Sequence, residues 1–188
     1  MKKTSLILLF LVFFIPVLLA IVLHSQWLEW QPESSRAHGE LIQPVVPLGD
    51  FAHESNDRTV DQDDLLDKWQ LVHVSPGGCG PDCLEFLYWL RQIRTAQDRH
   101  QPEIGLLVIS GTSLAAEIRA EIHELSPDYR IIDGATGAEL AERFPGPRDP
   151  SGYILDPEGN IILRYPADAD PNGIRRDLRR LLTWTQRD

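Results

Sequence analysis

Ser75-Pro76-Gly77-Gly78-Cys79-Gly80-Pro81-Asp82-Cys83 holds both cysteines of this chain. An apolar run at residues 69–74 precedes this stretch and has the composition of a buried strand. Residues 83–93 follow it, and their apolar side chains recur at helical spacing. The two sulfur atoms therefore lie where a predicted strand ends and a predicted helix begins.

The spacing of the cysteines predicts a reversible disulfide. Pro81 favours the first helical position, because no backbone N–H is needed there, so Cys79 lies at or just before the N-cap. Cys83 follows about one turn later, and residues four apart share a helix face with Cβ atoms about 5–6 Å apart. Modest local adjustment brings such a pair within disulfide distance. A helix N-terminus stabilises a thiolate, so we expect Cys79 to be the attacking sulfur.

The segment Cys79-Gly80-Pro81-Asp82-Cys83 resembles the Cys-Gly-Pro-Cys motif of thioredoxins with one residue inserted. Its Cys-x-x-x-Cys spacing resembles that of the Sco/SenC family of cytochrome oxidase copper-insertion factors. Both families have the thioredoxin fold. The resemblance therefore implies an α/β domain with a thioredoxin-like mixed sheet flanked by helices.

The remaining pattern agrees with that fold class. Strands alternate with helices, which predicts a sheet covered on both faces. Two apolar runs around a Pro/Gly turn, 151–155 and 160–165, predict an antiparallel hairpin. The other predicted strands are 69–74, 104–109 and 130–132, and the other predicted helices are 113–125, 138–144 and 174–184. We expect the domain to span residues 48–188.

The N-terminal segment predicts a membrane anchor. Residues 6–23 are apolar apart from Pro16, which is long enough to cross a bilayer as a helix. Lys2 and Lys3 precede this run, so the N-terminus is expected in the cytoplasm and the bulk of the chain on the far side. A cleaved signal peptide is the alternative, and the long apolar run without a clean Ala-x-Ala site disfavours it. We predict a single-pass anchor at 1–28 in the inner (cytoplasmic) membrane and a proline-punctuated tether at 29–47, which places the domain on the periplasmic side.

The charge excludes one class of partner. The chain has a net charge of −10, and the remainder carries −12 once the two N-terminal lysines are set aside. Such a surface repels phosphate backbones, and no basic stripe offsets it. We therefore expect no nucleic-acid binding.

Thioredoxins and Sco proteins differ at the position that corresponds to Pro150. In thioredoxins a cis-proline precedes the hairpin and packs against the active-site cysteines, which implies a cis bond between Asp149 and Pro150. In Sco proteins a histidine in the corresponding segment joins the cysteines as a copper ligand, and here Pro150 stands in its place. We therefore assign Cys79, Cys83 and Pro150 as catalytic. The two cysteines are also expected ligands of Cu(I), a soft ion that two thiolates can hold.

Other side chains carry weaker expectations. A nitrogen donor for Cu(II) could come only from His73 or His53, and no motif supports either. His73 is expected as a hydrogen-bonded core or edge histidine, with a ligand or proton-shuttle role as the alternative. Tyr88 and Trp89 are expected in the core rather than on a binding surface. His38, in the tether, is expected to be solvated.

Three functions remain open. The resemblance implies an accessory factor of cytochrome c oxidase assembly, with an oxidase subunit as partner, acting by thiol–disulfide exchange or Cu(I) handling. The second is a thiol–disulfide oxidoreductase for other exported or membrane proteins. The third is a non-catalytic interaction module with a structural disulfide, which the tiny loop between the cysteines disfavours because small loops gain little stability.

Overall fold

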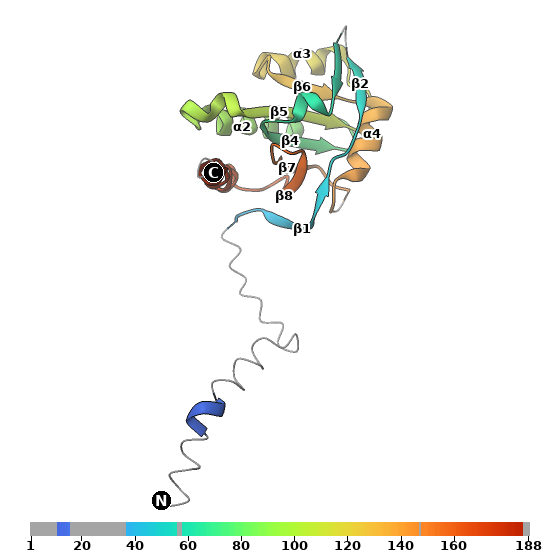
Figure 1. Cartoon of the computed structure of the whole chain (residues 1–188). Coiled ribbons are helices and arrows are strands. Elements are labelled where there is room, and N and C mark those ends of the chain that lie inside the picture. Colours follow the sequence, from blue (N-terminus) through green and yellow to red (C-terminus); the bar gives the residue numbers. More distant parts are fainter. Residues whose placement is uncertain (1–10, 16–36, 56–57, 147, 186–188) are drawn as a thin grey trace, which may run out of the picture. The chain divides into compact units, whose positions relative to one another are not determined.

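The computed structural model describes residues 11–15, 37–55, 58–146 and 148–185 (Figure 1). Contacts divide the chain into two units, Met1–Ser35 and Arg36–Asp188. In the first unit residues 11–15 are helical, and most of the predicted anchor lies outside the described residues. Within the described ranges, no helix has the length and apolar character needed to span a membrane.

A six-stranded mixed sheet forms the centre of the second unit, in the order β1-β8-β7-β4-β5-β6. Strands β4, β5 and β6 are parallel, and β7 and β8 form an antiparallel hairpin that joins the sheet at β4. The hairpin and the thioredoxin-like mixed sheet were both predicted from the sequence, and both are confirmed. The bounds are β1 Glu40–Pro47, β4 Trp69–Ser75, β5 Ile104–Ser110, β6 Tyr129–Ile132, β7 Ser151–Leu155 and β8 Asn160–Pro166.

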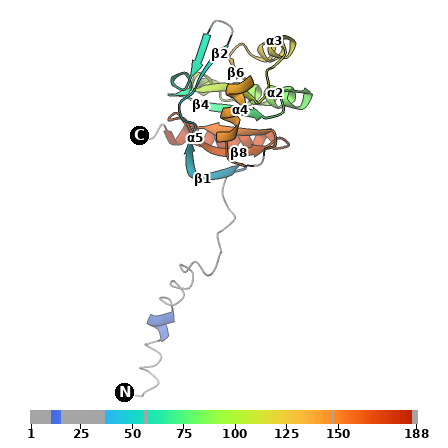
Figure 2. The ribbon, with the colours of Figure 1, turned by 90° about the vertical axis from the view of Figure 1, so that its right-hand side faces the viewer.

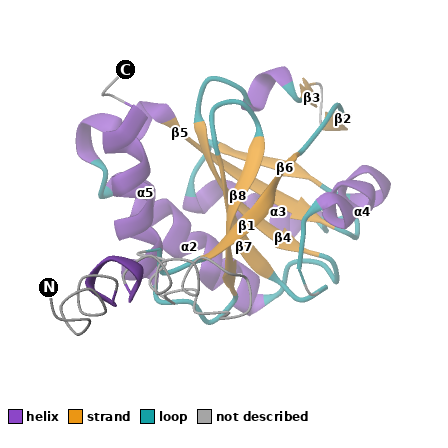
Figure 3. Cartoon of the chain, turned by 60° about the horizontal axis from the view of Figure 1, so that its bottom comes forward, coloured by secondary structure: helices purple, strands orange, loops and turns teal. Residues whose placement is uncertain are grey.

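Helices cover both faces of the sheet (Figure 3). Side chains alternate along a strand, so Leu71 packs with residues of α2 while Val72 packs with residues of α4. Helices α2, α3 and α5 enclose the first cluster, and α2 lies beside both α3 and α5. The helices are α2 Pro81–Thr95, α3 Ala116–Leu125, α4 Gly134–Arg143 and α5 Pro171–Thr185, with short 3-10 turns η1 Asp63–Leu65 and η2 Asp98–Glu103.

The sheet begins earlier in the chain than the sequence predicted. Residues 40–47, assigned to the tether, form β1, which pairs antiparallel with β8 at the sheet edge. The prolines in this segment favoured a tether, yet an edge strand tolerates proline. The buried Asp177 of α5 holds the chain just before β1, because its carboxylate accepts hydrogen bonds from the backbone N–H of His38 (2.6 Å) and Gly39 (3.0 Å).

His38 is exposed, as expected, but it contacts Asp177 of α5 rather than extending freely from a tether. Its Nδ1 lies 3.1 Å from Oδ1 of Asp177, and the Tyr165 hydroxyl donates to the same carboxylate at 3.0 Å. Burial and the adjacent Asp177 carboxylate both raise the pKa of Tyr165 above its usual range, with burial the larger cause. The start of the domain is thereby fixed to its last helix.

A small hairpin lies outside the main sheet. Strands β2 Ala52–Ser55 and β3 Arg58–Asp61 pair with each other, and β2 lies near β6 (Figure 2). Val60 and Leu65 bury their side chains in the cluster on the α4 face. His53 of the hairpin lies with its Nε2 3.5 Å from Oδ1 of the buried Asp133. The strands are too short to give a clear alternating pattern.

Candidate functional site

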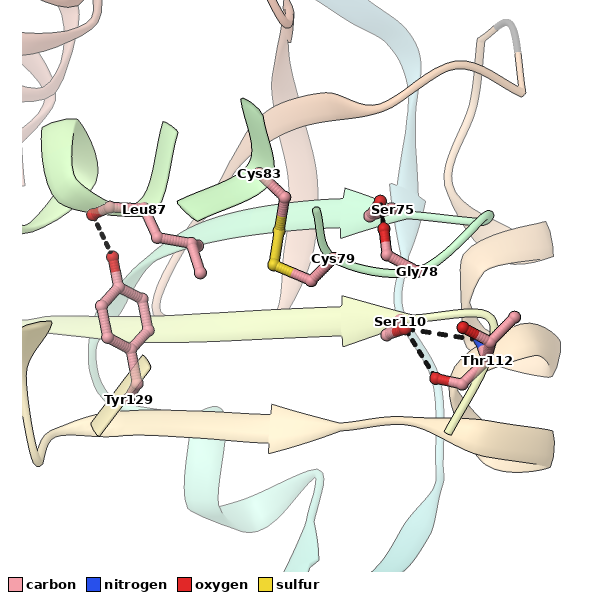
Figure 4. The surroundings of a disulfide bond; sticks show 8 residues. All are labelled: Ser75, Gly78, Cys79, Cys83, Leu87, Ser110, Thr112 and Tyr129. Carbon is pink, nitrogen blue, oxygen red and sulfur yellow. Dashed lines mark hydrogen bonds between the residues drawn. A yellow bond between two sulfur atoms is a disulfide. The ribbon is translucent and has the colours of Figure 1, made fainter. Parts of the chain in front are cut away.

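The loop after β4 is held in one conformation by short-range hydrogen bonds. The Ser75 carbonyl accepts from the backbone N–H of Gly78 (3.2 Å) and of Gly111 (3.1 Å), and the Ser75 hydroxyl donates to the Gly78 carbonyl (Figure 4). Gly78 has φ +99°, and a Cβ there would lie 2.8 Å from the Thr112 hydroxyl oxygen. Only glycine meets both conditions. This turn delivers Cys79 to the N-terminus of α2.

Cys79 and Cys83 are joined in a disulfide, as the sequence predicted. Gly80 is the N-cap of α2 and Pro81 its first residue, so Cys79 lies just before the cap. The Cα atoms of the two cysteines are 5.1 Å apart, an ordinary separation for a disulfide. Cys83 is only 6% exposed whereas Cys79 is partly exposed, so an incoming thiolate reaches Cys79 more easily.

Two contacts hold the N-terminal half of α2 against the sheet. A Cβ at Gly152 of β7 would lie 2.6 Å from the ring of Phe86, so the missing side chain lets this ring approach the strand. The Tyr129 hydroxyl donates to the Leu87 carbonyl at 2.5 Å (Figure 4), and burial raises the pKa of this tyrosine above its usual range. The first two turns of α2 are therefore fixed relative to β6 and β7.

His73 is a buried imidazole on the same face of the sheet. It is 1% exposed, and its ring stacks on Phe86 with centroids 4.8 Å apart. Neither ring nitrogen has a partner at hydrogen-bonding geometry. Burial lowers the pKa of His73 from 6.5 to about 4, and the Ser151 backbone opposes this shift only in part. His73 is thus a neutral core residue at physiological pH, as expected.

A family model described as "transmembrane-like, thioredoxin-like, C-terminal domain" matches residues 69–185, the stretch from β4 through α5. The chain belongs to this thioredoxin-like family. Its match includes the cysteine motif, the strand before it and the closing hairpin and helix. A comparison with curated protein sequences gives no match.

Solved structures of Sco proteins are similar in fold to this thioredoxin-like domain. Yeast Sco1 with copper bound matches with a TM-score of 0.61 at 15% identity, over 76% of this chain and 95% of that chain. Apo Sco1 from Thermus thermophilus gives 0.59 at 17%, over 77% and 96%. Copper-bound ScoI from Bradyrhizobium japonicum gives 0.54 at 18%, over 72% and 98%. Identities this low show a shared, Sco-like thioredoxin fold.

The thioredoxin-like domain does not contain the predicted cis bond at Pro150. Among the described residues the cis peptide bond is Gln43–Pro44, so the prediction for Asp149–Pro150 was wrong. Pro150 is exposed and immediately precedes β7, whose first residue, Ser151, pairs with Val74 near the end of β4. The Ser151 hydroxyl donates to the Asp149 carbonyl at 3.1 Å, which closes a surface turn that needs no cis bond. The catalytic role assigned to Pro150 stays a prediction.

The donor set fits Cu(I) better than Cu(II). After reduction, two sulfur atoms on one face of a helix turn can converge on one soft ion. In the part of the chain that the structure describes, no group of three or more His, Cys, Asp or Glu residues is arranged to hold a metal. His73 stacks on Phe86 and His53 pairs with Asp133, so neither completes a site with the cysteines.

Tyr88 and Trp89 were expected in the core and are both 41% exposed, so that expectation was wrong. The buried stripe of α2 runs through Cys83, Phe86, Leu87, Leu90 and Ile93, and these two positions lie beside it. Their rings contact each other edge to face, with centroids 5.3 Å apart. The helix that carries the disulfide therefore presents an aromatic pair to solvent.

Proposed function

We propose that this protein exchanges disulfides with partner thiols through Cys79 and Cys83, as a membrane-anchored accessory factor of cytochrome oxidase assembly. The observation that carries the proposal is the disulfide itself, at a helix N-terminus with one accessible and one buried sulfur. The Sco-like fold and the apolar segment at residues 6–23 support the assembly role and the anchor.

The exchange follows from the geometry in two steps. A partner thiolate attacks Sγ of Cys79, the bond to Cys83 breaks, and Cys83 leaves as a thiolate. A second partner thiolate then attacks the partner's sulfur in the mixed disulfide and releases Cys79 as a thiolate. The partner is oxidised by two electrons, and the Cys79–Cys83 pair is reduced. In the opposite direction, the reduced pair opens a partner disulfide with Cys79 as nucleophile.

The surroundings favour this assignment of the two sulfurs. Backbone N–H groups at the start of α2 stabilise negative charge on Cys79. Cys83 lies in the core beside Phe86, where burial favours its protonated or disulfide form over the thiolate. Position and burial thus favour Cys79 as the cysteine that forms the mixed disulfide and Cys83 as the cysteine that resolves it.

Handling of Cu(I) is the second candidate function, and the convergence of two sulfurs favours it. Yeast Sco1 and Bradyrhizobium ScoI were both solved with copper bound. This chain has proline at the position where the resemblance would place the copper-ligand histidine. Copper would be carried as cargo on two thiolates, and the disulfide form would not bind it.

The redox equilibrium of the full chain distinguishes exchange from a structural disulfide. The protein in a neutral detergent is equilibrated with glutathione buffers of graded ratio, quenched with acid and alkylated to count free thiols. We expect the pair to titrate above about −300 mV, within reach of such buffers. A disulfide that stays closed across the whole series would contradict the proposal and support the structural role.

A further inference from the structure

A groove lies between α2 and α5, and its lining includes Asp82, which stands between the two cysteines in the sequence. Its volume is ≈ 430 Å³. Helix α2 contributes Asp82, Glu85 and Trp89, which recur at helical spacing on one face, and the start of α5 forms the opposite wall. The α2–α5 groove begins in the first helical turn, where Asp82 directly precedes Cys83. A hollow of this size accepts a few side chains rather than a whole domain.

The groove has an apolar floor and an acidic rim. Most of its lining is apolar, and Phe86, Leu90 and Ile174 in it are buried, while Trp89 is exposed. The rim carries the carboxylates of Asp82, Glu85 and Asp168, and no Lys or Arg lines it. All three acidic side chains are exposed, and none makes an ion pair with another described residue.

We propose that the α2–α5 groove docks a basic segment of the partner protein that reacts at Cys79. Lys and Arg side chains complement the three unpaired carboxylates, and an exposed tryptophan attracts a cation over its ring face. The apolar floor receives an aliphatic or aromatic side chain of the same segment. A partner bound there lies next to the helix turn that holds the disulfide.

This inference extends the proposed function by naming the kind of partner, and it rests on that function only for the identity of the reaction. Docking is therefore measured with a peptide that contains no cysteine. A failure of docking then leaves the exchange result unchanged, and a failure of exchange leaves the docking result unchanged.

The test is a titration of a short fluorescein-labelled peptide, several Lys and Arg around one Phe, with the full chain in a neutral detergent. Anisotropy reports binding at low and at moderate salt. We expect saturable binding that weakens about tenfold in Asp82→Asn/Glu85→Gln/Asp168→Asn, because each exposed charge pair makes a small favourable contribution and the triple variant removes three of them. Trp89→Ala is expected to weaken it as well.

The matched control removes the same charge elsewhere. Glu117, Glu121 and Glu124 are exposed on α3, and their triple change to Gln should alter the affinity less than about twofold. Equal weakening in both triple variants would overturn the proposal, because binding would then follow net charge alone. Absence of saturable binding would also overturn it. Dimerisation of the full chain that Trp89→Ala abolishes would assign the groove to a second copy instead.

Discussion

The reduced full chain is expected to bind one Cu(I) through Cys79 and Cys83 and to form no stable coloured complex with Cu(II). Two thiolates, one just before α2 and one in its first turn, satisfy the low coordination number of Cu(I). Cu(II) prefers an additional nitrogen donor, and the described part of the chain places no histidine with both sulfurs. The measurement is a titration with each oxidation state, following competition with a Cu(I) chelator and thiolate-to-Cu(II) absorption.

Variants make this copper prediction specific. Cys79→Ser or Cys83→Ser leaves a single thiolate, and Cu(I) binding should fall below detection in the presence of the chelator. His73→Ala should leave Cu(I) binding unchanged, because His73 is buried against Phe86. A coloured Cu(II) complex that disappears in His73→Ala would show instead that His73 is a ligand. Failure to bind either ion would remove copper handling and leave thiol exchange as the function.

The second large effect is a loss of stability in acid that originates at His73. Its pKa is about 4 in the folded protein and 6.5 in the unfolded chain, so the unfolded chain binds more protons between these values. The free energy of unfolding should therefore fall as the pH drops from about 6.5 to about 4. The free energy of unfolding falls by about 3 kcal/mol in total over this range, and it has its full value above the unfolded pKa.

Urea unfolding of the full chain across this pH range measures the effect. His73→Leu keeps an apolar side chain of similar size in the core and should flatten the pH dependence by about that amount. His123→Gln is the control, since His123 is exposed on α3, and it should follow the parent protein. Parallel curves for the parent and His73→Leu would show that the imidazole does not titrate as its burial implies.

Local patterns predicted the elements that hold the cysteines. A continuous apolar run predicted β4, helical spacing after Pro81 predicted α2, and a Pro/Gly turn predicted the β7–β8 hairpin. Each of these signals lies within about fifteen residues, which is the range over which periodicity is informative. The disulfide followed because both cysteines lie in one such window.

Long-range features were not visible in those patterns. The attachment of His38 to Asp177 joins residues 139 positions apart, and it converts a proline-containing segment into edge strand β1. The cis bond assigned to Pro150 came from resemblance alone, and a surface turn stands there instead.

Trapping of partner proteins in cells tests whether disulfide exchange occurs at Cys79. Full-length Cys83→Ser, Cys79→Ser and the double variant are expressed in source cells, quenched with acid, alkylated and separated without reductant. We expect reductant-sensitive adducts with exported or membrane proteins, an oxidase subunit among them, in Cys83→Ser and far fewer in Cys79→Ser. Adducts in Cys83→Ser no more abundant than in the double variant, or more abundant in Cys79→Ser, would contradict exchange at Cys79.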